Sequence, residues 1–196
     1  MRIVLASASP RRSELLRQVG VDFKVKLKET NEDCNLIKPY DYVKDLSLRK
    51  AMAVFKSLDE SEAKDTVVIG ADTVVYHDGK ILLKPKDRED AFNIIKELSG
   101  NTHQVYTGVA LVTYKRVVNF SEKTDVYVYT LSDDIINDYV NTKEPYDKAG
   151  AYGIQGLFGA YIKGIDGDYN NVVGLPVSRV VYELNKLGYR IDYERY

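Results

Sequence analysis

The sequence is poor in cysteine and histidine, and each shortage narrows the chemistry open to the protein. Its one cysteine, Cys34, cannot form a disulfide within the chain, and no cysteine cluster exists for a structural zinc site. The two histidines, His77 and His103, have no sequence neighbours that suggest a catalytic pairing. This composition fits a reducing compartment, so we predict a cytoplasmic protein.

The sequence also lacks an excess of either charge and any long hydrophobic run. Its 28 basic and 29 acidic residues leave a formal net charge of −1. The large positive field that long nucleic acid requires is therefore absent. No segment approaches the roughly 18 apolar residues that span a bilayer, and Arg2–Ala6 is too short for a signal sequence. We expect a soluble protein that binds neither membranes nor long nucleic acid, so any polyanionic partner is small.

What the sequence does contain is an ordinary globular composition, with 44% hydrophobic and 29% charged residues. Its 196 residues suit one domain, predicted to span residues 1–196.

Apolar patterning predicts a mixed α/β fold. Residues 3–6 are typical of a buried strand. Ser9 and Pro10 are typical of the start of a helix, which Gly20 ends. Residues 21–27 are typical of a half-buried strand. Further helices are expected at residues 41–58, after Asp87, after Ser132 and at 176–187. Further strands are expected at residues 66–69 and around 158–165. Residues 74–76 and 81–83 are expected to form a hairpin around Asp78-Gly79, and residues 103–114 and 117–130 a long antiparallel pair. The long pair implies a mixed twisted sheet with helices on its faces.

The first candidate site is Ser7-Ala8-Ser9-Pro10-Arg11-Arg12, between a strand and a helix start. Free backbone N–H groups and the helix dipole favour an anion there, so two hydroxyls and two arginines suggest a phosphate cradle. The alternative is an ordinary helix cap followed by solvated arginines.

The second candidate is a lysine on the apolar face of a helix. At 100° per residue, Val43, Leu46, Lys50 and Val54 project within about 80° of one another. Lys50 therefore faces inward, where it either extends back to the surface or neutralises a buried phosphate.

Carboxylates form the third candidate. Asp72 is predicted near a strand end, where it can hold a metal or deprotonate water, although turn aspartates that bond their own backbone are common. Glu29, Glu32 and Asp33 could complete an oxygen-ligand site for Mg²⁺, or form a solvated loop.

The fourth candidate is the glycine-rich stretch of residues 144–156. Its small residues let the backbone approach a ligand, and the Gln155 amide offers a donor and an acceptor to a base edge. Glycine spacing alone equally fits a plain connection between elements.

Taken together, the motifs resemble the Maf family across essentially the whole chain. The matching segments are Ser7 to Arg12, Gly70-Ala71-Asp72-Thr73, Lys84-Pro85-x-Asp87, Leu98-Ser99-Gly100, Asp147 to Gly156, Gly167-Asp168-Tyr169 and Val173-Gly174-Leu175-Pro176.

The resemblance implies hydrolysis of a nucleoside triphosphate to its monophosphate and pyrophosphate by a two-lobed Maf/ITPase-like α/β protein with a central cleft, commonly a homodimer. Asp72 matches the proton acceptor of the family, and Arg12, Glu32 and Lys50 match its other catalytic residues. Asp72 and Glu32 would coordinate a divalent cation, Mg²⁺ or Mn²⁺.

Within the family, Arg11, Thr73, Lys84 and Gln155 resemble the branch that acts on dTTP, UTP and modified uridine triphosphates. Ser7, Ser9 and Lys148 complete the expected substrate-binding set. The alternatives are the sister branch, which prefers 7-methyl-GTP, and a non-enzymatic regulator of septum formation.

Overall fold

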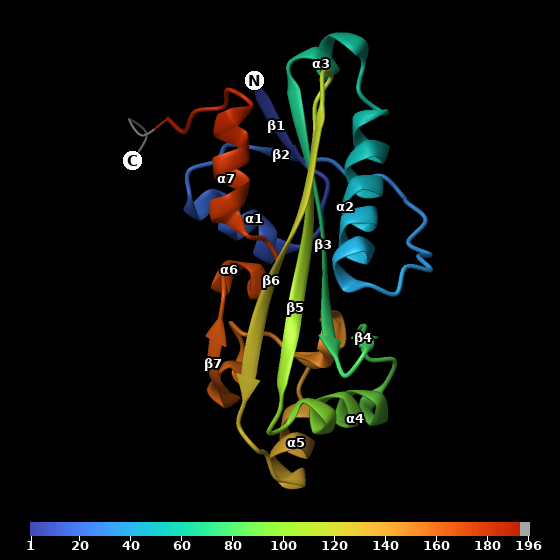
Figure 1. Ribbon diagram of the computed structural model, residues 1–196, viewed down its shortest axis with the longest axis vertical. Coiled ribbons are helices and arrows are strands. Elements are labelled where there is room, and N and C mark those ends of the chain that lie inside the picture. Colours follow the sequence, from blue (N-terminus) through green and yellow to red (C-terminus); the bar gives the residue numbers. More distant parts are fainter. Residues whose placement is uncertain (193–196) are drawn as a thin grey trace.

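A computed structural model describes residues 1–192, and its centre is a seven-stranded mixed sheet (Figure 1). Strand β1 pairs in parallel with β2 and β3, whereas every other pairing is antiparallel. The order is β2-β1-β3-β5-β6-β7, with β4 paired to β3. The strands are β1 Arg2–Leu5, β2 Lys24–Val25, β3 Thr66–His77, β4 Lys80–Leu82, β5 Thr102–Val112, β6 Val117–Val128 and β7 Ile162–Asp166. The predicted mixed sheet is confirmed.

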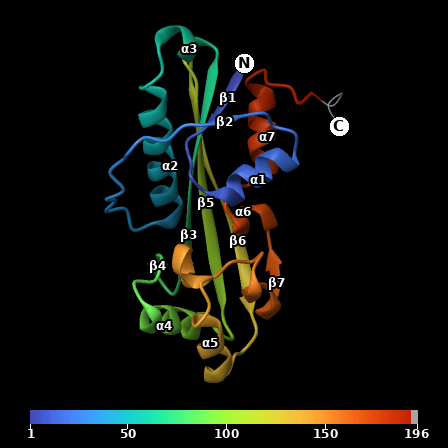
Figure 2. The ribbon, with the colours of Figure 1, turned by 180° about the vertical axis from the view of Figure 1, so that it is seen from behind.

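Three long strands, β3, β5 and β6, run through almost the full length of the molecule and join two lobes (Figure 1). Residues that alternate along β3 point to opposite faces, as the pleat requires. Val68 packs beneath α2 and Ile69 beneath α1 and α7. Figure 2 shows the same division from behind, with α2 on one side of the strands and α1 with α7 on the other.

Helices cover both faces of the upper lobe, and α4 and α5 close the lower one (Figure 1). The helices are α1 Pro10–Gln18, α2 Pro39–Phe55, α3 Glu60–Lys64, α4 Arg88–Leu98, α5 Asp133–Val140, α6 Tyr169–Val173 and α7 Val177–Lys186, and the short 3₁₀ turns are η1 Pro145–Asp147, η2 Ala149–Ala151 and η3 Leu157–Tyr161. None of the helices within residues 1–192 is long and apolar enough to cross a membrane.

Local capping signals placed several elements correctly. Asp87 accepts a hydrogen bond from the backbone of Asp90, and Ser132 does so from Ile135, at the starts of α4 and α5. Asp78 and Gly79 both have positive φ in the turn between β3 and β4, as a tight hairpin requires. Ser9 occupies the N-cap position of α1, but its side chain makes no capping hydrogen bond.

The predicted strand at residues 21–27 is wrong apart from two residues. Only Lys24 and Val25 pair with β1, and Val25 and Leu27 are 49% and 53% exposed. The apolar alternation is buried only in its first half, where Val21 and Phe23 pack into the core, whereas Val25 and Leu27 stay exposed. Apolar periodicity alone cannot reveal whether a covering layer exists.

The predicted position of Asp72 near a strand end is also wrong. Strand β3 continues unbroken from Thr66 to His77 because it pairs residue by residue with β5 across the Gly70-Ala71 step. Asp72 therefore lies in the middle of a long strand. Helices α3 and α6 were not predicted, because five residues are too few to display a helical period. The first part of the predicted 158–165 strand is the turn η3.

Candidate active site

A cleft of about 770 Å³ between the lobes gathers all the catalytic and substrate-binding residues proposed from the sequence, but not Glu29 and Asp33. Its upper wall is the β1–α1 loop, α2 and β3, and its lower wall is formed by the β4–α4 loop and the η1–η3 segment. The lining includes Ser7, Ser9, Arg11, Arg12, Glu32, Lys50, Asp72, Thr73, Lys84, Lys148 and Gln155. The volume is in the range of small-molecule sites in proteins.

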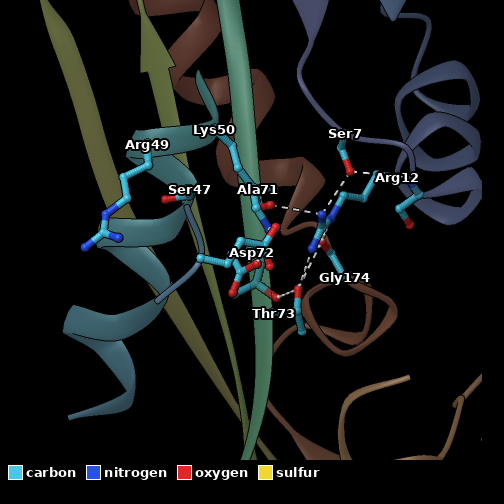
Figure 3. A network of polar contacts seen from close by, with 12 residues as sticks. Ser7, Arg12, Ser47, Arg49, Lys50, Ala71, Asp72, Thr73 and Gly174 are labelled. Carbon is cyan, nitrogen blue, oxygen red and sulfur yellow. Dashed lines mark hydrogen bonds and ion pairs between the residues drawn. The ribbon is translucent and has the colours of Figure 1, made fainter. Parts of the chain in front are cut away.

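An ion-pair triad of Lys50, Asp72 and Glu32 lines the cleft, and Figure 3 shows Lys50 and Asp72. Lys50 Nζ is 2.7 Å from Asp72 Oδ1 and 3.1 Å from Glu32 Oε1. The Lys50 and Asp72 side chains are only 19% and 13% exposed, whereas Glu32 is 61% exposed. The prediction that Lys50 faces inward is confirmed, and its ammonium meets a carboxylate instead of extending to the surface.

Close packing of α2 on the sheet makes the Lys50–Asp72 contact possible. A Cβ atom on Gly70 would lie 2.2 Å from the Ser47 carbonyl oxygen, and one on Gly108 equally close to the Val43 carbonyl oxygen at 2.2 Å. Helix backbone therefore rests directly on strand backbone at two glycines. Lys50 lies one turn after Ser47 on α2, and its side chain reaches Asp72, two residues after Gly70 on the same face of β3.

Arg12 lines the cleft and is held by hydrogen bonds to the protein, so it is not a solvated helix arginine (Figure 3). Its guanidinium uses four hydrogen bonds to protein oxygens, namely Gly174 O at 2.8 Å, Ser7 Oγ at 2.9 Å, Ala71 O at 2.9 Å and Thr73 Oγ1 at 3.0 Å. Burial lowers the pKa of Arg12, and the nearby Asp72 carboxylate opposes that shift. A guanidinium has five N–H donors and remains charged, so Arg12 is a fixed positive charge.

Thr73 and Thr107 connect this arginine to the lower part of the cleft. The two residues are register partners on β3 and β5, and their hydroxyl oxygens are 2.9 Å apart. Thr107 also donates to the backbone oxygen of Asn171, and both residues are fully buried. The sequence offered no signal for Thr107 or Asn171, because only strand pairing and the docking of α6 bring them here.

An ion pair between Asp147 of the lower wall and Arg11 of the β1–α1 loop spans the cleft. Asp147 Oδ2 is 3.3 Å from Arg11 Nη1, and its Oδ1 is 2.5 Å from Lys148 Nζ. Partial burial acts to raise the pKa of Asp147, but Lys148 and Arg11 together hold it below its ordinary value. Asp147 is thus a cleft residue that the sequence placed only within a longer motif. It neutralises two cations that were proposed to bind substrate.

The two carboxylates of the triad suit a divalent cation that arrives with a phosphate ligand. Within residues 1–192, no group of three or more His, Cys, Asp or Glu side chains is placed to hold a metal. Mg²⁺ commonly binds one or two protein carboxylates and completes its shell with waters and substrate phosphates, so Asp72 and Glu32 fit this pattern. The broader cluster with Glu29 and Asp33 is not formed, since only Glu32 of the three lines the cleft.

Neither histidine is placed for acid–base chemistry in the cleft. His103 is fully buried, its Nε2 lies 2.7 Å from the Tyr152 hydroxyl, and burial chiefly lowers the pKa of His103 to about 3. It therefore stays neutral at physiological pH and supports the packing of Tyr152. His77 bonds the Thr102 carbonyl through Nδ1 at the end of β3.

Comparison with known proteins gives a consistent result along the chain. A family model described as "Maf-like protein" matches residues 2–187. The dTTP/UTP pyrophosphatase of Agathobacter rectalis is 48% identical, over 95% of this chain and 98% of the relative. The dTTP/UTP pyrophosphatase of Bacillus cytotoxicus is 46% identical, over 94% of this chain and 95% of the relative. Among solved structures, the Staphylococcus aureus Ham1 protein aligns with a TM-score of 0.47 and 14% identity, over 65% of this chain and 72% of that chain.

Proposed function

Because this chain belongs to the Maf family, we propose that it is a nucleoside triphosphate pyrophosphatase that hydrolyses dTTP and UTP to the monophosphate and pyrophosphate. The observation that carries the assignment is the largely buried Lys50–Asp72 pair beside Arg12, within one cleft large enough for a nucleotide. The residue roles that follow are part of the proposal.

The cleft supplies the positive charge that a triphosphate requires. Cationic side chains line both walls, namely Arg11, Arg12, Lys28, Lys50, Lys84 and Lys148. Fixed cations directed at developing negative charge stabilise a phosphoryl transition state more than a flexible surface could, because they need not reorganise during the reaction. Arg12, with four hydrogen bonds to the protein, is the most rigidly held of these groups.

Asp72 is proposed to accept the proton from the attacking water. Water oxygen would form a bond to the α-phosphorus while the bond from that phosphorus to the bridging oxygen breaks, so that pyrophosphate leaves. Lys50 donates to Asp72 Oδ1 and thereby orients the carboxylate. Rigid placement on a central strand suits a general base, whose rate contribution depends on geometry.

Asp72 and Glu32 are the proposed ligands of a divalent cation, Mg²⁺ or Mn²⁺. When bound, such a cation would screen phosphate charge and polarise the phosphorus–oxygen bonds. Glu32 lies on the loop before α2 and is largely exposed, so its carboxylate can adjust to an incoming ligand more freely than Asp72 can.

Nucleotide selection is proposed to depend on the residues that reach into the cleft from both lobes. Gln155 and Lys84 line the lower wall, and Arg11 the upper. The Thr73 hydroxyl is hydrogen-bonded to Arg12 and Thr107, so we assign it the role of positioning Arg12. By resemblance to the family we also propose a single domain over residues 1–196, a homodimer and a cytoplasmic location.

Pyrophosphate release by the purified protein with Mg²⁺ or Mn²⁺ tests the function. We expect release from dTTP and UTP, and little from CTP, GTP, ATP or 7-methyl-GTP. Release from 7-methyl-GTP alone would keep the reaction and overturn the pyrimidine assignment. No release from any of these nucleotides would instead favour the regulator of septum formation.

A further inference from the structure

A single carboxylate outside the triad anchors the loop that carries Gln155. Glu144 Oε2 accepts a hydrogen bond from the backbone N–H of Leu157 at 2.7 Å, and its Oε1 accepts one from Phe158 at 3.3 Å. The buried Tyr139 hydroxyl shares its one proton between the same Oε1 at 3.1 Å and the Ala151 carbonyl oxygen at 3.2 Å. Both oxygens are therefore engaged, and the carboxylate ties α5 to the first turn of η3.

The backbone beside Gln155 lies directly against this carboxylate. A Cβ atom on Gly156 would lie 2.3 Å from Glu144 Oε2 and 2.3 Å from its Cδ. Gly156 has φ −101° and ψ −157°, an extended conformation that any residue can adopt. Glycine is needed here for space, which means that the distance between the loop and Glu144 is narrowly set.

The other end of the loop is held through Lys148. Its Nζ donates to the Glu144 backbone oxygen at 2.6 Å, and a Cβ atom on Gly153 would lie 2.8 Å from Lys148 Cε. Residues 153–156 thus pack against Lys148 at one end and Glu144 at the other, with Gln155 between the two close approaches.

The hydrogen-bond partners of the Glu144 carboxylate show that it acts on the loop, although cationic side chains line the same cleft. Within the described residues 1–192, the hydrogen bonds of the Glu144 carboxylate come from two backbone amides and one phenol, while Lys148 contacts its backbone oxygen. Charged acceptors form the stronger class of hydrogen bond to N–H donors, so this carboxylate, bonded to two amides and a phenol, fixes the geometry of the loop.

We infer that Glu144 is a positioning residue for nucleotide selection, whose carboxylate sets the place of Gln155 in the cleft without touching the reacting phosphates. This inference rests on the proposed pyrophosphatase function. It predicts that Glu144 governs the affinity for the correct nucleotide and has little effect on the chemical step.

The variant Glu144→Gln tests this with almost no change in shape. One amide oxygen cannot replace two carboxylate oxygens, and the new NH₂ group would face an N–H or O–H donor. We expect KM for dTTP and UTP to rise about tenfold with kcat within about twofold, because a lost charge-assisted hydrogen bond changes an equilibrium by roughly that factor. The preference for dTTP over CTP falls as well.

The matched control is Glu183→Gln, which alters a buried carboxylate bound by Arg179 and Lys186 on α7, outside the cleft lining. It should leave KM and the dTTP preference at wild-type values. In a Gln155→Ala background, Glu144→Gln should have no further effect on the preference, since both changes remove the same contact. Additive effects, or an equal loss on all nucleotides, would overturn the inference.

Hydrogen exchange gives a second readout that needs no turnover. Amides of residues 153–161 should exchange faster in Glu144→Gln than in wild type or Glu183→Gln, because the one remaining side-chain oxygen cannot accept from both Leu157 and Phe158. Unchanged exchange overturns the anchoring role. If wild type hydrolyses no nucleotide, the proposed function fails, and calorimetric binding of dTTP and CTP to the same variants then decides the role of Glu144 in place of KM.

Discussion

Charge at the centre of the cleft is balanced before any ligand binds. Asp72 and Glu32 contribute two negative charges and Lys50 and Arg12 two positive ones, so the group is formally neutral. Buried charges are tolerated when paired in this way. An incoming triphosphate therefore needs further positive charge. Lys84 and the proposed divalent cation would supply it, together with Arg11 and Lys148 once these exchange Asp147 for phosphate.

At this scale the sharpest prediction concerns the proposed base. Asp72→Asn keeps the shape of the side chain but cannot accept the proton from water. We expect kcat for dTTP to fall about 10²- to 10⁴-fold, the usual contribution of a general base. Pyrophosphate release under single-turnover conditions measures the loss.

Folding of that variant should be preserved, because Lys50 keeps its ion pair with Glu32. A far-UV circular dichroism spectrum like that of wild type is the control. Near-wild-type turnover in a correctly folded Asp72→Asn protein would show that another group accepts the proton.

Among the elements, α2 determines the geometry of the site through its contact with β3 and β5. Its backbone touches the strands at Gly70 and Gly108, and its length carries Lys50 from that contact to Asp72. A displacement of the helix would therefore be felt both in stability and at the triad.

Gly108→Ala tests this close contact. The added Cβ would meet backbone atoms of Val43 and Lys44 at 2.2 to 2.7 Å, which cannot rotate away. We expect the free energy of unfolding to fall by about 1–3 kcal/mol, as for overpacked cores, and turnover to fall as Lys50 moves. Urea denaturation and the pyrophosphate assay measure the two effects.

Gly164→Ala on β7 provides the matched comparison, since a Cβ there would find only Tyr127 Cδ2 at 3.9 Å. It should change stability by less than about 0.5 kcal/mol, as surface substitutions usually do. Equal destabilisation by both substitutions would mean that strand glycines matter for some reason other than the approach of α2.

The whole molecule is divided into lobes but shares its long strands between them. Register partners continue without interruption from Val68–Val112 to Tyr76–Gln104 on β3 and β5, and from Thr102–Tyr127 to Val112–Val117 on β5 and β6. Neither lobe could lose its strands while the other kept them. The proposal of one domain over residues 1–196 follows the same reasoning.

We therefore predict one cooperative unfolding transition. Urea curves followed by far-UV circular dichroism and by the fluorescence of the sixteen tyrosines should coincide. Two separated transitions would contradict a single folding unit. A midpoint that rises with protein concentration would support the proposed homodimer, because association stabilises the folded chain by mass action.

Several features could be predicted from the sequence because they depend on interactions between residues close together in the chain. Helical periodicity placed Lys50 on the buried face of α2, the Asp87 and Ser132 caps marked the starts of α4 and α5, and Asp78-Gly79 marked a hairpin. These depend on neighbours within a few residues. The family motifs add the list of candidate cleft residues, though not their contacts.

Tertiary structure alone decided the rest. It made β3 one strand with Asp72 at its middle and limited the strand pairing within residues 21–27 to Lys24 and Val25. It also connected Thr107 and Asn171 to Thr73 and tied Glu144 to the cleft loop. Each of these outcomes depends on partners beyond the local sequence, from 13 residues apart for Glu144 and Leu157 to 64 for Thr107 and Asn171. The sequence by itself therefore determined which side chains are available, whereas the pairing of distant strands and loops decided which of them meet.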